Sequence, residues 1–330
     1  MATTTQKPIR IGTRRSNLAV VQAEGVRDNL QKLFPTRSFE IETLHTLGDK
    51  DKSTALYNFN AKSLWTTELE EKLTSGELDV IVHCLKDMPT TLPTTCTLAA
   101  IPARDDPRDA LIVKSGLPYT SLSTLPTGAV VGTSSVRRSA QLRRLYPHLQ
   151  FANLRGNVET RLAKVDKPEG EYTCMVMSAA GLERIGLKPR ITQYLGSKDG
   201  GILHAVGQGA LGLEIRAGDE EIEKLLDGLV DRGSTLACLV ERELMRTLEG
   251  GCSVPIGVET EWVAGKEGVL RVRAIVVSLD GTQAVEEEVE APVGSEEESV
   301  KFGRDVAARL VKGGADKILN EIVATRPPKE

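Results

Sequence analysis

Aromatic side chains, long apolar runs and an excess of charge of one sign are all scarce in this sequence. Only 4% of its 330 residues are aromatic, and its net charge is −4 at pH 7, which offers no long-range attraction to nucleic acid or to an anionic membrane. No apolar run approaches the ~18–20 residues of a membrane-spanning helix, and residues 1–7 lack the apolar segment of a secretion signal. Nothing in the sequence demands a second chain. We therefore expect a cytoplasmic monomer that binds neither a membrane nor nucleic acid.

Cysteine is sparse as well, and its spacing excludes two classes of small-domain scaffold. The five cysteines are scattered, odd in number and never in CxxC spacing; they are Cys84, Cys96, Cys174, Cys238 and Cys252. This argues against a disulfide framework and against a zinc site. The four histidines also lack zinc-ligand spacing. We expect no metal and at least one free thiol.

Nucleotide-binding motifs are missing or stand in the wrong context. No GxxxxGK[ST] segment occurs, which argues against an ATPase. Residues 207–212 match GxGxxG, but the LEIR that follows is strand-like, so no helix begins there to receive a phosphate. We predict no dinucleotide site.

The sequence does contain the pattern of an α/β protein. Apolar residues make up 40% of the chain, enough for a substantial core. Strands are predicted at 9–12, 39–43 and 78–84, with helices at 16–33 and 66–73 between them. This alternation predicts a largely parallel, doubly wound sheet with helices on both faces and ligands at the carboxyl ends of its strands.

The pattern begins again after a linker rich in Pro, Ser and Gly at 116–128. A second α/β unit is predicted from strands at 129–132, 150–154 and 173–178 and a helix at 134–145. A helix at 236–248, strands within 269–279 and 284–293 and a final helix at 299–323 predict a third, smaller α+β domain. Seven glutamates without a base between Glu286 and Glu298 indicate a solvated edge and loop.

Arginine is concentrated between residues 130 and 161. Six arginines in this segment face a single acid, Glu159; they are Arg137, Arg138, Arg143, Arg144, Arg155 and Arg161. Guanidinium groups at strand ends suit a ligand with several fixed anions, whereas a solvated helix face is the alternative and fits Arg143 and Arg144. Arg137 and Arg138 follow a strand-to-helix turn, and this position favours an anion site.

Two further segments can carry chemistry. Lys86 and Asp87 directly follow the apolar strand at 78–84, although adjacent charges in a loop are more often a local surface pair. Cys252 follows Gly250-Gly251, where a thiol is accessible to a small molecule. Most lone cysteines are buried apolar groups, and Cys238 fits that description better.

Nine segments are distinctive enough to compare with known families: IRIGTRRSNLAVVQA, HTLGDKD, DVIVHCLKDMPT, IPARDDPRDAL, VGTSSVRRSAQL, NLRGNVETRL, AAGLERIG, AVGQGALGLEIR and LEGGCSVPIGV. Together, and in this order from Ile9 to about Val258, they resemble the hydroxymethylbilane synthase family, also called porphobilinogen deaminase. Several segments are long and unusual, so their joint occurrence is highly specific.

The resemblance implies a fold of two doubly wound domains, like those of periplasmic binding proteins, that flank a cleft, with a small α+β domain at the C-terminal end. It also implies that the chain returns to the first domain after Gly207. We expect domain 1 at residues 1–113 plus about 207–230, domain 2 at 114–206 and domain 3 at 231–330.

The resemblance also implies the reaction. A transferase of haem and tetrapyrrole biosynthesis condenses four porphobilinogens head to tail, releases ammonia at each step and finally frees hydroxymethylbilane by hydrolysis. The product grows on a covalent dipyrromethane cofactor, held as a thioether by the Cys of the GGCS motif, which is Cys252 here. A soft thiol suits this anchor because it can add to the electrophilic methylene that the growing chain attacks.

Individual residues match the functional positions of the family. Asp87 of the LKD motif matches the central catalytic group, a carboxylate that stabilises the cationic azafulvene left when ammonia departs and that can assist proton movement. The matches to cofactor-binding positions are Cys252, Lys86, Asp87, Thr133, Ser134, Ser135, Arg137, Arg138 and Arg155. The matches to positions that hold substrate carboxylates are Arg14, Ser16, Arg155 and Arg161.

Two positions depart from the family, and one segment resembles its lid. Cys84 stands where Ser is common and Thr67 where Lys is frequent, so no role is carried to either. Residues 47–64 resemble a flexible lid, whose motion is a hypothesis.

Two other classes of protein share some of these features. A non-enzymatic two-domain receptor for an anionic solute would share the fold and the arginines, but would have no use for a reactive cysteine and would need a secretion signal. A nucleic-acid binder would use the arginines, against the net acidity and the few aromatic residues.

Overall fold

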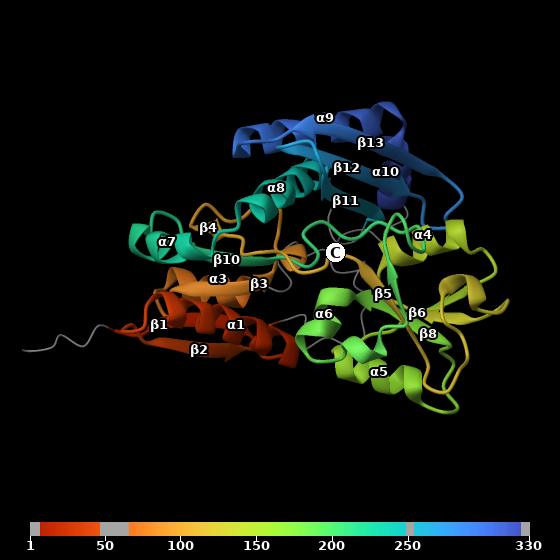
Figure 1. The fold of residues 1–330 in the computed structure, drawn as a ribbon, viewed down its shortest axis with the longest axis horizontal. Helices are drawn as coiled ribbons and strands as arrows, with labels where there is room; N and C mark the ends of the chain where they lie inside the picture. Colours follow the sequence, from red (N-terminus) through yellow and green to blue (C-terminus); the bar gives the residue numbers. More distant parts are fainter. Residues whose placement is uncertain (1–6, 47–65, 249–253, 325–330) are drawn as a thin grey trace, which may run out of the picture. The chain divides into compact units, whose positions relative to one another are not determined.

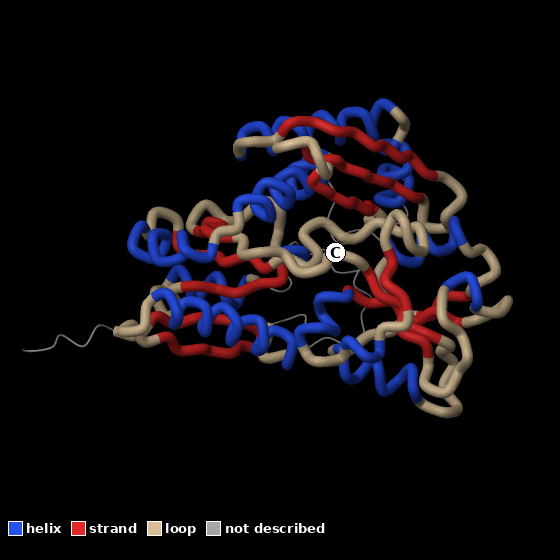
Figure 2. Tube along the Cα trace, viewed as in Figure 1, coloured by secondary structure: helices blue, strands red, loops and turns tan. Residues whose placement is uncertain are grey.

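The computed structural model describes residues 7–46, 66–248 and 254–324, whose helices and strands are shown in Figures 1 and 2. These segments form two compact units, the first with residues 7–46, 66–104 and 210–235 and the second with 105–209, 236–248 and 254–324. Within the described residues, no helix has the length and apolar character needed to cross a membrane. The expected lid at 47–64 and the expected anchor Cys252 lie outside the described residues.

Five strands form the sheet of the first unit: β1 (Ile9–Arg14), β2 (Phe39–Leu44), β3 (Val80–Cys84), β4 (Cys96–Ala100) and β10 (Leu211–Arg216). Their order is β2-β1-β3-β10-β4. β1 is parallel to β2 and β3, whereas β10 runs antiparallel between β3 and β4. The expected largely parallel sheet is confirmed, and β10, which follows Gly207 in the chain, lies within it.

Helices cover both faces of this sheet, as predicted. The helical segments are α1 (Asn17–Leu33), α3 (Thr67–Thr74), the short 3-10 helices η2 (Leu85–Asp87) and η5 (Asp227–Leu229), and α7 (Glu220–Leu226). Leu30 of α1 and Leu225 of α7 pack in one cluster with Val82 of β3. Leu69 of α3 packs in another with Ile81. Because successive strand residues point to opposite faces, α1 and α7 lie on one face and α3 on the other.

The second unit contains a similar five-stranded sheet. Its strands are β5 (Asp109–Val113), β6 (Val130–Gly132), β7 (Gln150–Ala152), β8 (Cys174–Ser178) and β9 (Gln193–Leu195), in the order β7-β6-β8-β5-β9. β6 is parallel to β7 and β8, and β5 is the antiparallel member. Each of the two sheets therefore has one antiparallel strand next to its edge, and both are doubly wound.

One predicted boundary needs correction at β5. The expected end of domain 1 at residue 113 assigns β5 to the first domain, but β5 pairs with β8 from Asp109↔Ser178 to Val113↔Cys174. The ladder of backbone hydrogen bonds fixes this strand in the second sheet, where every residue from Asp109 to Val113 is buried. The sequence signal for the boundary, a linker at 116–128, lies after this strand rather than before it.

The helices of the second sheet are short, and its α-helices begin at side-chain caps. They are η3 (Leu122–Thr124), α4 (Val136–Leu145), α5 (Val158–Asp166), α6 (Ala179–Arg184) and η4 (Lys188–Arg190). Ser135 caps α4 by accepting a hydrogen bond from the Arg138 backbone N–H, and Asn157 caps α5 in the same way through Thr160. Such caps satisfy N–H groups that have no partner within the helix.

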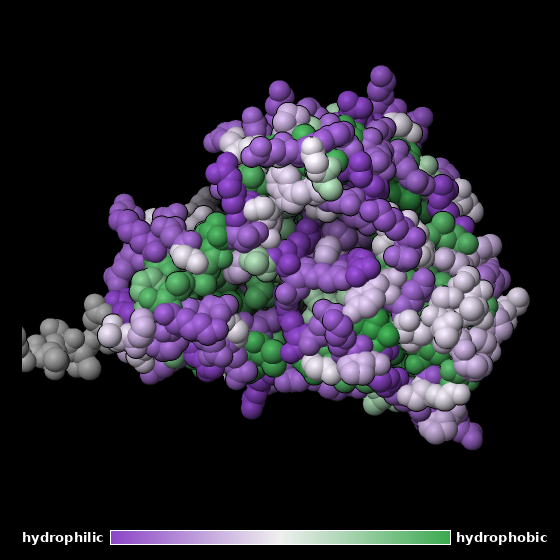
Figure 3. Space-filling model, viewed as in Figure 1, coloured by the Kyte–Doolittle hydropathy of each residue, from purple (hydrophilic) through white to green (hydrophobic). Residues whose placement is uncertain are grey.

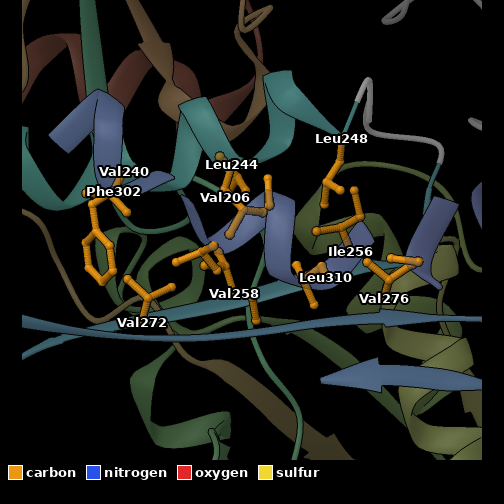
Figure 4. Packing of buried hydrophobic residues seen from close by; sticks show 14 of the residues in the cluster. Val206, Val240, Leu244, Leu248, Ile256, Val258, Val272, Val276, Phe302 and Leu310 are labelled. Atoms are coloured by element: carbon orange, nitrogen blue, oxygen red, sulfur yellow. The ribbon is translucent and has the colours of Figure 1, made fainter. Parts of the chain in front are cut away.

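A third, antiparallel sheet belongs to the same compact unit. It consists of β11 (Ile256–Trp262), β12 (Val269–Val277) and β13 (Ala284–Pro292), with α8 (Arg232–Thr247), α9 (Glu296–Lys312) and α10 (Ala315–Ala324). Figure 4 shows the core between them, where Leu244 of α8 and Phe302 and Leu310 of α9 pack towards Val258 and Val272. The predicted α+β character of this region is confirmed, and the division into three domains stays a prediction.

The single helix predicted at 299–323 is wrong, because two glycines divide it. α9 ends at Gly313, and Gly314 has a φ of +99°, a conformation that glycine adopts without the strain a side chain would add. α10 then begins at Ala315 and buries Ile318 and Ile322 in the same core.

Two glutamates of the acidic run at Glu286–Glu298 form ion pairs with arginines of a neighbouring strand. Glu288 and Glu290 of β13 pair with Arg273 and Arg271 of β12, whose side chains lie across the strand ladder. These partners are distant in sequence, so the run looks uncompensated when read along the chain. Its location on an edge strand and at the start of α9 agrees with the predicted solvated edge.

Helix α4 joins the second and third sheets. Ala140 of α4 shares a buried cluster with Leu203, Ile275 and Val277. A Cβ on Gly281 would lie 2.9 Å from the Ala140 carbonyl oxygen, so the turn after β12 can touch α4 only because this residue has no side chain. The start of β11 and the start of α4 are therefore held within one packed body.

The contact of α9 with α8 gives a test of this packing. A Cβ on Gly303 would lie 2.6 Å from the Val240 carbonyl oxygen and 2.9 Å from Cβ of Glu243. We expect Gly303→Ala to lower the free energy of unfolding by about 1–3 kcal/mol, measured by urea denaturation, because the helices must separate. Gly25→Ala in α1 is the control, since a Cβ added at Gly25 would have no atom within 4 Å. This change should raise the free energy of unfolding by about 1 kcal/mol. Equal effects of the two changes would contradict this account.

Candidate active site

Four of the predicted site residues lie at one edge of the first sheet. β1 and β3 are neighbouring parallel strands whose register pairs Gly12 with Ile81, so their carboxyl ends lie together. Arg14 ends β1 and Ser16 follows it, while Lys86 and Asp87 follow β3 in η2. The expected clustering at strand ends is thus present within this unit.

The turn that carries Lys86 and Asp87 is anchored on both sides of these residues. The Leu85 N–H donates to the Ala210 carbonyl at 3.0 Å, and the Met88 N–H donates to the Leu85 carbonyl at 3.2 Å. Leu85 and Met88 are buried, whereas Lys86 and Asp87 are half-buried. The apolar residues hold the turn and present the charged pair at the surface of the unit.

This anchorage depends on a glycine in the returning strand. A Cβ on Gly212 of β10 would lie 3.0 Å from Cδ1 of Leu85 and would overlap Sδ of Met88. Gly212 therefore allows the turn to pack directly on the backbone of β10. The GxGxxG match at 207–212, rejected above as a dinucleotide site, contains this residue.

The Ser16 hydroxyl is not used to cap α1. Ser16 occupies the N-cap position, where serine often accepts a hydrogen bond from the helix backbone, but its side chain makes no such bond. Its backbone carbonyl accepts from the Val20 N–H instead. The hydroxyl group therefore remains available to a ligand at the same edge as Asp87.

Cys84, one of the two departures from the family pattern, contacts a buried glutamine. Nε2 of Gln22 in α1 lies 3.1 Å from Sγ of Cys84 and can donate to it. Gln22 is 4% exposed. The amide thus ties α1 to the last residue of β3, a link that the sequence analysis did not anticipate.

A second set of predicted residues lies at the carboxyl edge of the second sheet. Thr133, Ser134 and Ser135 connect the end of β6 to α4. Oγ of Ser134 donates to the Leu154 carbonyl at 2.7 Å, and Oγ1 of Thr133 accepts from the Ser135 N–H at 3.2 Å. The turn is therefore ordered by its own hydroxyl groups, each of which keeps an unused lone pair or proton for a ligand.

Arg155 lies in the neighbouring loop between β7 and α5, and Arg161 lies in α5. Gly156 between them has a φ of +124°, which turns the chain tightly into the helix. Nε of Arg161 donates to the Gly156 carbonyl at 2.7 Å. Because β7 is parallel to β6, this loop and the turn at 133–135 lie at the same edge of the sheet.

The strongest electrostatic feature of the site is a single carboxylate shared by two guanidinium groups. Nη1 of Arg137 lies 2.7 Å from Oδ2 of Asp109, and Nη2 of Arg138 lies 2.7 Å from Oδ1. Asp109 is fully buried, and the arginines are 4% and 7% exposed. These residues, on α4 and at the start of β5, form what we call the Asp109 cluster.

The charges of the Asp109 cluster do not balance. Burial acts to raise the pKa of Asp109, but the two guanidinium groups outweigh it and hold that pKa far below its usual range. Burial in turn lowers the pKa of Arg137, against the attraction of Asp109. Two positive charges and one negative charge leave one positive charge in excess, and such an excess in a buried place favours an anionic ligand.

One backbone carbonyl and one side-chain amide also form hydrogen bonds within the Asp109 cluster. The Leu203 carbonyl accepts from Nη1 of Arg137 at 2.6 Å, and Nε2 of Gln208 donates to Oδ1 of Asp109 at 2.9 Å. Neither Asp109 nor Gln208 is among the residues that the sequence motifs predict for the site. An acid that directly precedes the apolar run at 110–113 was the available signal for Asp109, whereas nothing in the sequence pointed to Gln208.

Arg143 and Arg144, which the sequence placed on a solvated helix face, are half-buried and exposed respectively, and both contact neighbouring segments. Arg144 pairs with Glu286 at 2.7 Å, and Arg143 donates to the Leu279 carbonyl and lies over the ring of Phe151. These three contacts join α4 to its neighbours within the second unit. In the part of the chain that the structure describes, no group of three His, Cys, Asp or Glu side chains could hold a metal ion.

Comparison with known proteins gives the chain's family. Residues 9–224, more than half of the chain, match the family model described as porphobilinogen deaminase, dipyromethane cofactor binding domain, and residues 235–312 match the C-terminal domain of porphobilinogen deaminase. The chain belongs to the porphobilinogen deaminase family. The predicted relationship to hydroxymethylbilane synthase is therefore confirmed.

Curated relatives agree over nearly the whole length of the chain. The porphobilinogen deaminase of Yarrowia lipolytica is 54% identical, over 94% of this chain and 92% of its own length. That of Saccharomyces cerevisiae is 49% identical over 95% and 97%, and that of Synechococcus elongatus is 46% identical over both chains in full. Among solved structures, the second substrate binding domain of a putative amino acid ABC transporter from Streptococcus pneumoniae has a TM-score of 0.42 at 14% identity, covering 68% of this chain and 92% of that one.

Family membership makes the chain an enzyme, a transferase of tetrapyrrole biosynthesis whose cofactor is dipyrromethane and whose substrate is porphobilinogen. A non-enzymatic receptor for an anionic solute is not favoured. The described residues fit the cofactor, because each of its two pyrrole rings brings two carboxylates, and the Asp109 cluster offers guanidinium donors with a positive charge in excess.

The Asp109 cluster predicts a pH-dependent loss of stability. We expect Asp109→Asn to lower the free energy of unfolding at pH 7 by about 3–5 kcal/mol, because two buried cations lose their partner. Since the folded pKa of Asp109 is depressed, its contribution is full above the ordinary value of about 3.9 and is lost as the pH falls below it. The difference between variant and wild type should therefore shrink below pH 4 in urea denaturation.

Two control variants separate this effect from a general loss of charge. Arg137→Ala should cost less than Asp109→Asn, because Arg138 still neutralises Asp109. Asp28→Asn removes an exposed carboxylate paired only with its neighbour Arg27 and should change stability by less than about 0.5 kcal/mol. A pH-independent difference between Asp109→Asn and wild type would refute the electrostatic explanation.

Proposed function

We propose that this enzyme joins four porphobilinogens head to tail, releases one ammonia at each step and frees hydroxymethylbilane by hydrolysis, with the residues of the two sheet edges in distinct roles. The single structural observation that supports the assignment is the Asp109 cluster, where two buried guanidinium groups share one carboxylate. A substrate and a cofactor that carry a pair of carboxylates on every ring supply the anions that such a cluster requires.

Asp87 is the proposed catalytic residue. Loss of ammonia from the aminomethyl group of porphobilinogen leaves a cationic azafulvene, and a carboxylate held against its pyrrole N–H stabilises the charge as it develops. The turn at 85–88 suits this task because its backbone is anchored to Ala210 and its flanking residues are buried. The carboxylate therefore changes position little during the reaction, which is what electrostatic stabilisation requires.

Arg14, Ser16, Arg155 and Arg161 are the proposed holders of the substrate's acetate and propionate groups. Arg14 and Ser16 share the sheet edge of Asp87, and the Ser16 hydroxyl is not engaged in capping. A guanidinium group can hold a carboxylate through two parallel hydrogen bonds, which fixes orientation as well as position. Orientation matters here, since the aminomethyl carbon must face its acceptor.

Dipyrromethane is proposed to be joined to Cys252 and held by Lys86, Asp87, Thr133, Ser134, Ser135, Arg137, Arg138 and Arg155. When bound, it supplies the unsubstituted pyrrole carbon to which the first porphobilinogen is joined. The hydroxyl groups of Thr133, Ser134 and Ser135 sit beside the first turn of α4, whose N–H groups also favour anions.

We further propose that the enzyme is a cytoplasmic monomer of three domains that binds no nucleic acid. The net charge of −4 supports the last point. On the face drawn in Figure 3, hydrophilic residues predominate and hydrophobic ones stand in small patches between them, as is usual for a protein without an obligate partner.

The cofactor anchor can be tested by intact-mass measurement. We expect the purified wild-type chain to carry an adduct of dipyrromethane size and Cys252→Ala to lack it, because the thioether needs the sulfur atom. Cys84→Ser is the control and should keep the adduct, since it removes the half-buried thiol of Cys84 and leaves Cys252 unchanged. An unmodified wild-type chain that still turns over porphobilinogen would rule out the anchor.

The role of Asp87 can be tested by the rate of ammonia release. Asp87→Asn should keep the fold and the covalent adduct but slow ammonia release ~100- to 1,000-fold, because an amide cannot stabilise the cation as a carboxylate does. Asp305→Asn, an exposed carboxylate on α9, should leave the rate unchanged. Normal turnover in Asp87→Asn would exclude it as the cation-stabilising group.

A further inference from the structure

Three titratable side chains are buried beneath the turn that carries Asp87, and the mechanism above leaves them unused. Nε2 of His83 in β3 lies 2.8 Å from Oε2 of Glu214 in β10, with both side chains almost fully buried. Glu70 of α3, 8% exposed, lies close enough for its charge to act on both. We call these residues the Glu70 triad.

The Glu70 triad contains one acid more than its surroundings can neutralise. Oε1 of Glu70 and Oε1 of Glu214 are buried and have no hydrogen-bond partner among the described residues. Two ionised carboxylates in this space would repel each other, and within the described part of the chain only the side chain of His83 is placed to offset them. One neutral acid resolves the conflict, since a protonated carboxyl group carries no charge.

Of the two acids, Glu70 is the one whose surroundings favour the protonated form. Burial raises the pKa of Glu70, and the charge of Glu214 raises it further, against the opposing effects of Thr66 and His83. Glu214 already has a partner, because Nε2 of His83 lies 2.8 Å from its Oε2. Charge balance and geometry therefore both favour Glu70 as the neutral acid.

The other charged and titratable groups on this face do not change that assignment. Cys96 of β4 also faces the two acids, and its pKa is raised to about 11 by burial first and then by those carboxylates, so the thiol stays neutral. Arg216, two residues beyond Glu214 on the same face of β10, is engaged by Asp79, Asp219 and the Leu73 carbonyl.

The Glu70 triad and the Asp87 turn rest on the same short stretch of β10. Ala210 accepts the hydrogen bond from the Leu85 N–H, Gly212 accommodates Leu85 and Met88, and Glu214 binds His83. Gly212 pairs with His83 across the ladder, so the turn and the imidazole lie on the same face of β10. Any displacement of β10 against β3 or α3 is transmitted directly to the turn.

We propose that Glu70, His83 and Glu214 are positioning residues for Asp87, with Glu70 protonated in the active enzyme and its ionisation displacing the Asp87 turn. This inference rests on the proposed role of Asp87. A second buried negative charge beside Glu214 would push α3 away from β10. The consequence is a fall in kcat at high pH, with little change in KM, because Arg14 and Ser16 hold the substrate from a different strand.

The test is the pH profile of ammonia release by the cofactor-loaded enzyme. Glu70→Gln imitates the protonated acid, so its alkaline fall in kcat should move up by at least one pH unit relative to wild type. Glu71→Gln is the matched control, the same change on the adjacent, exposed residue of α3, and its profile should coincide with that of wild type. Glu214→Gln should lower kcat ~10-fold with KM and adduct occupancy within about twofold.

Each outcome bears on a different statement. Identical normalised profiles for Glu70→Gln and wild type would overturn the proposal, and so would an effect confined to thermal stability. Should Glu214→Gln fail to fold, the profile of Glu70→Gln still decides the matter, because its side chain has the same shape as the protonated acid. Normal ammonia release by Asp87→Asn would instead refute the proposed function, independently of the triad.

Discussion

Two guanidinium groups of the second unit share one buried carboxylate. Their two positive charges exceed its one negative charge, so one positive charge is left without a partner in this cluster. Asp109 starts the strand that completes the second sheet, while Arg137 and Arg138 occupy the first turn of the helix after β6. The same contact therefore fixes β5 against α4 and leaves a positive charge in excess at the sheet edge where we propose that the cofactor binds. The same arrangement of charges stabilises the fold and favours an anionic ligand. A change at Asp109 is therefore expected to alter both stability and ligand binding.

The first unit solves the converse problem, an excess of buried acid. Glu70 and Glu214 lie on either side of His83 beneath the Asp87 turn. A proton can neutralise the excess negative charge of the Glu70 triad, so its effect is expected in the pH profile of the enzyme. The excess positive charge of the Asp109 cluster is instead neutralised by a carboxylate ligand, so its effect is expected in ligand affinity. Both arrangements sit directly behind a strand end, where small displacements of the backbone reach the reacting groups.

The antiparallel strand of each sheet is what brings distant segments to these edges. β10 returns to the first sheet between β3 and β4, and it supplies Ala210, Gly212 and Glu214 to the support of Asp87. β5 does the same in the second sheet through Asp109. The loop at 203–208 adds the Leu203 carbonyl and the Gln208 amide to the arginines. The residues of the sequence motifs are thus supported by contacts with residues that lie far from them in the sequence.

The sequence by itself determined the family, the alternation of strands and helices that begins each α/β unit, and the motif residues, because these depend on local periodicity and on residues that stand side by side in the chain. Only the tertiary structure decided that β5 belongs to the second sheet, that Gly313 and Gly314 divide the last helix, and that Asp109 pairs with Arg137 and Glu214 with His83. Strand pairing, burial and charge balance are sums over neighbours in space, and no single segment of the sequence contains them.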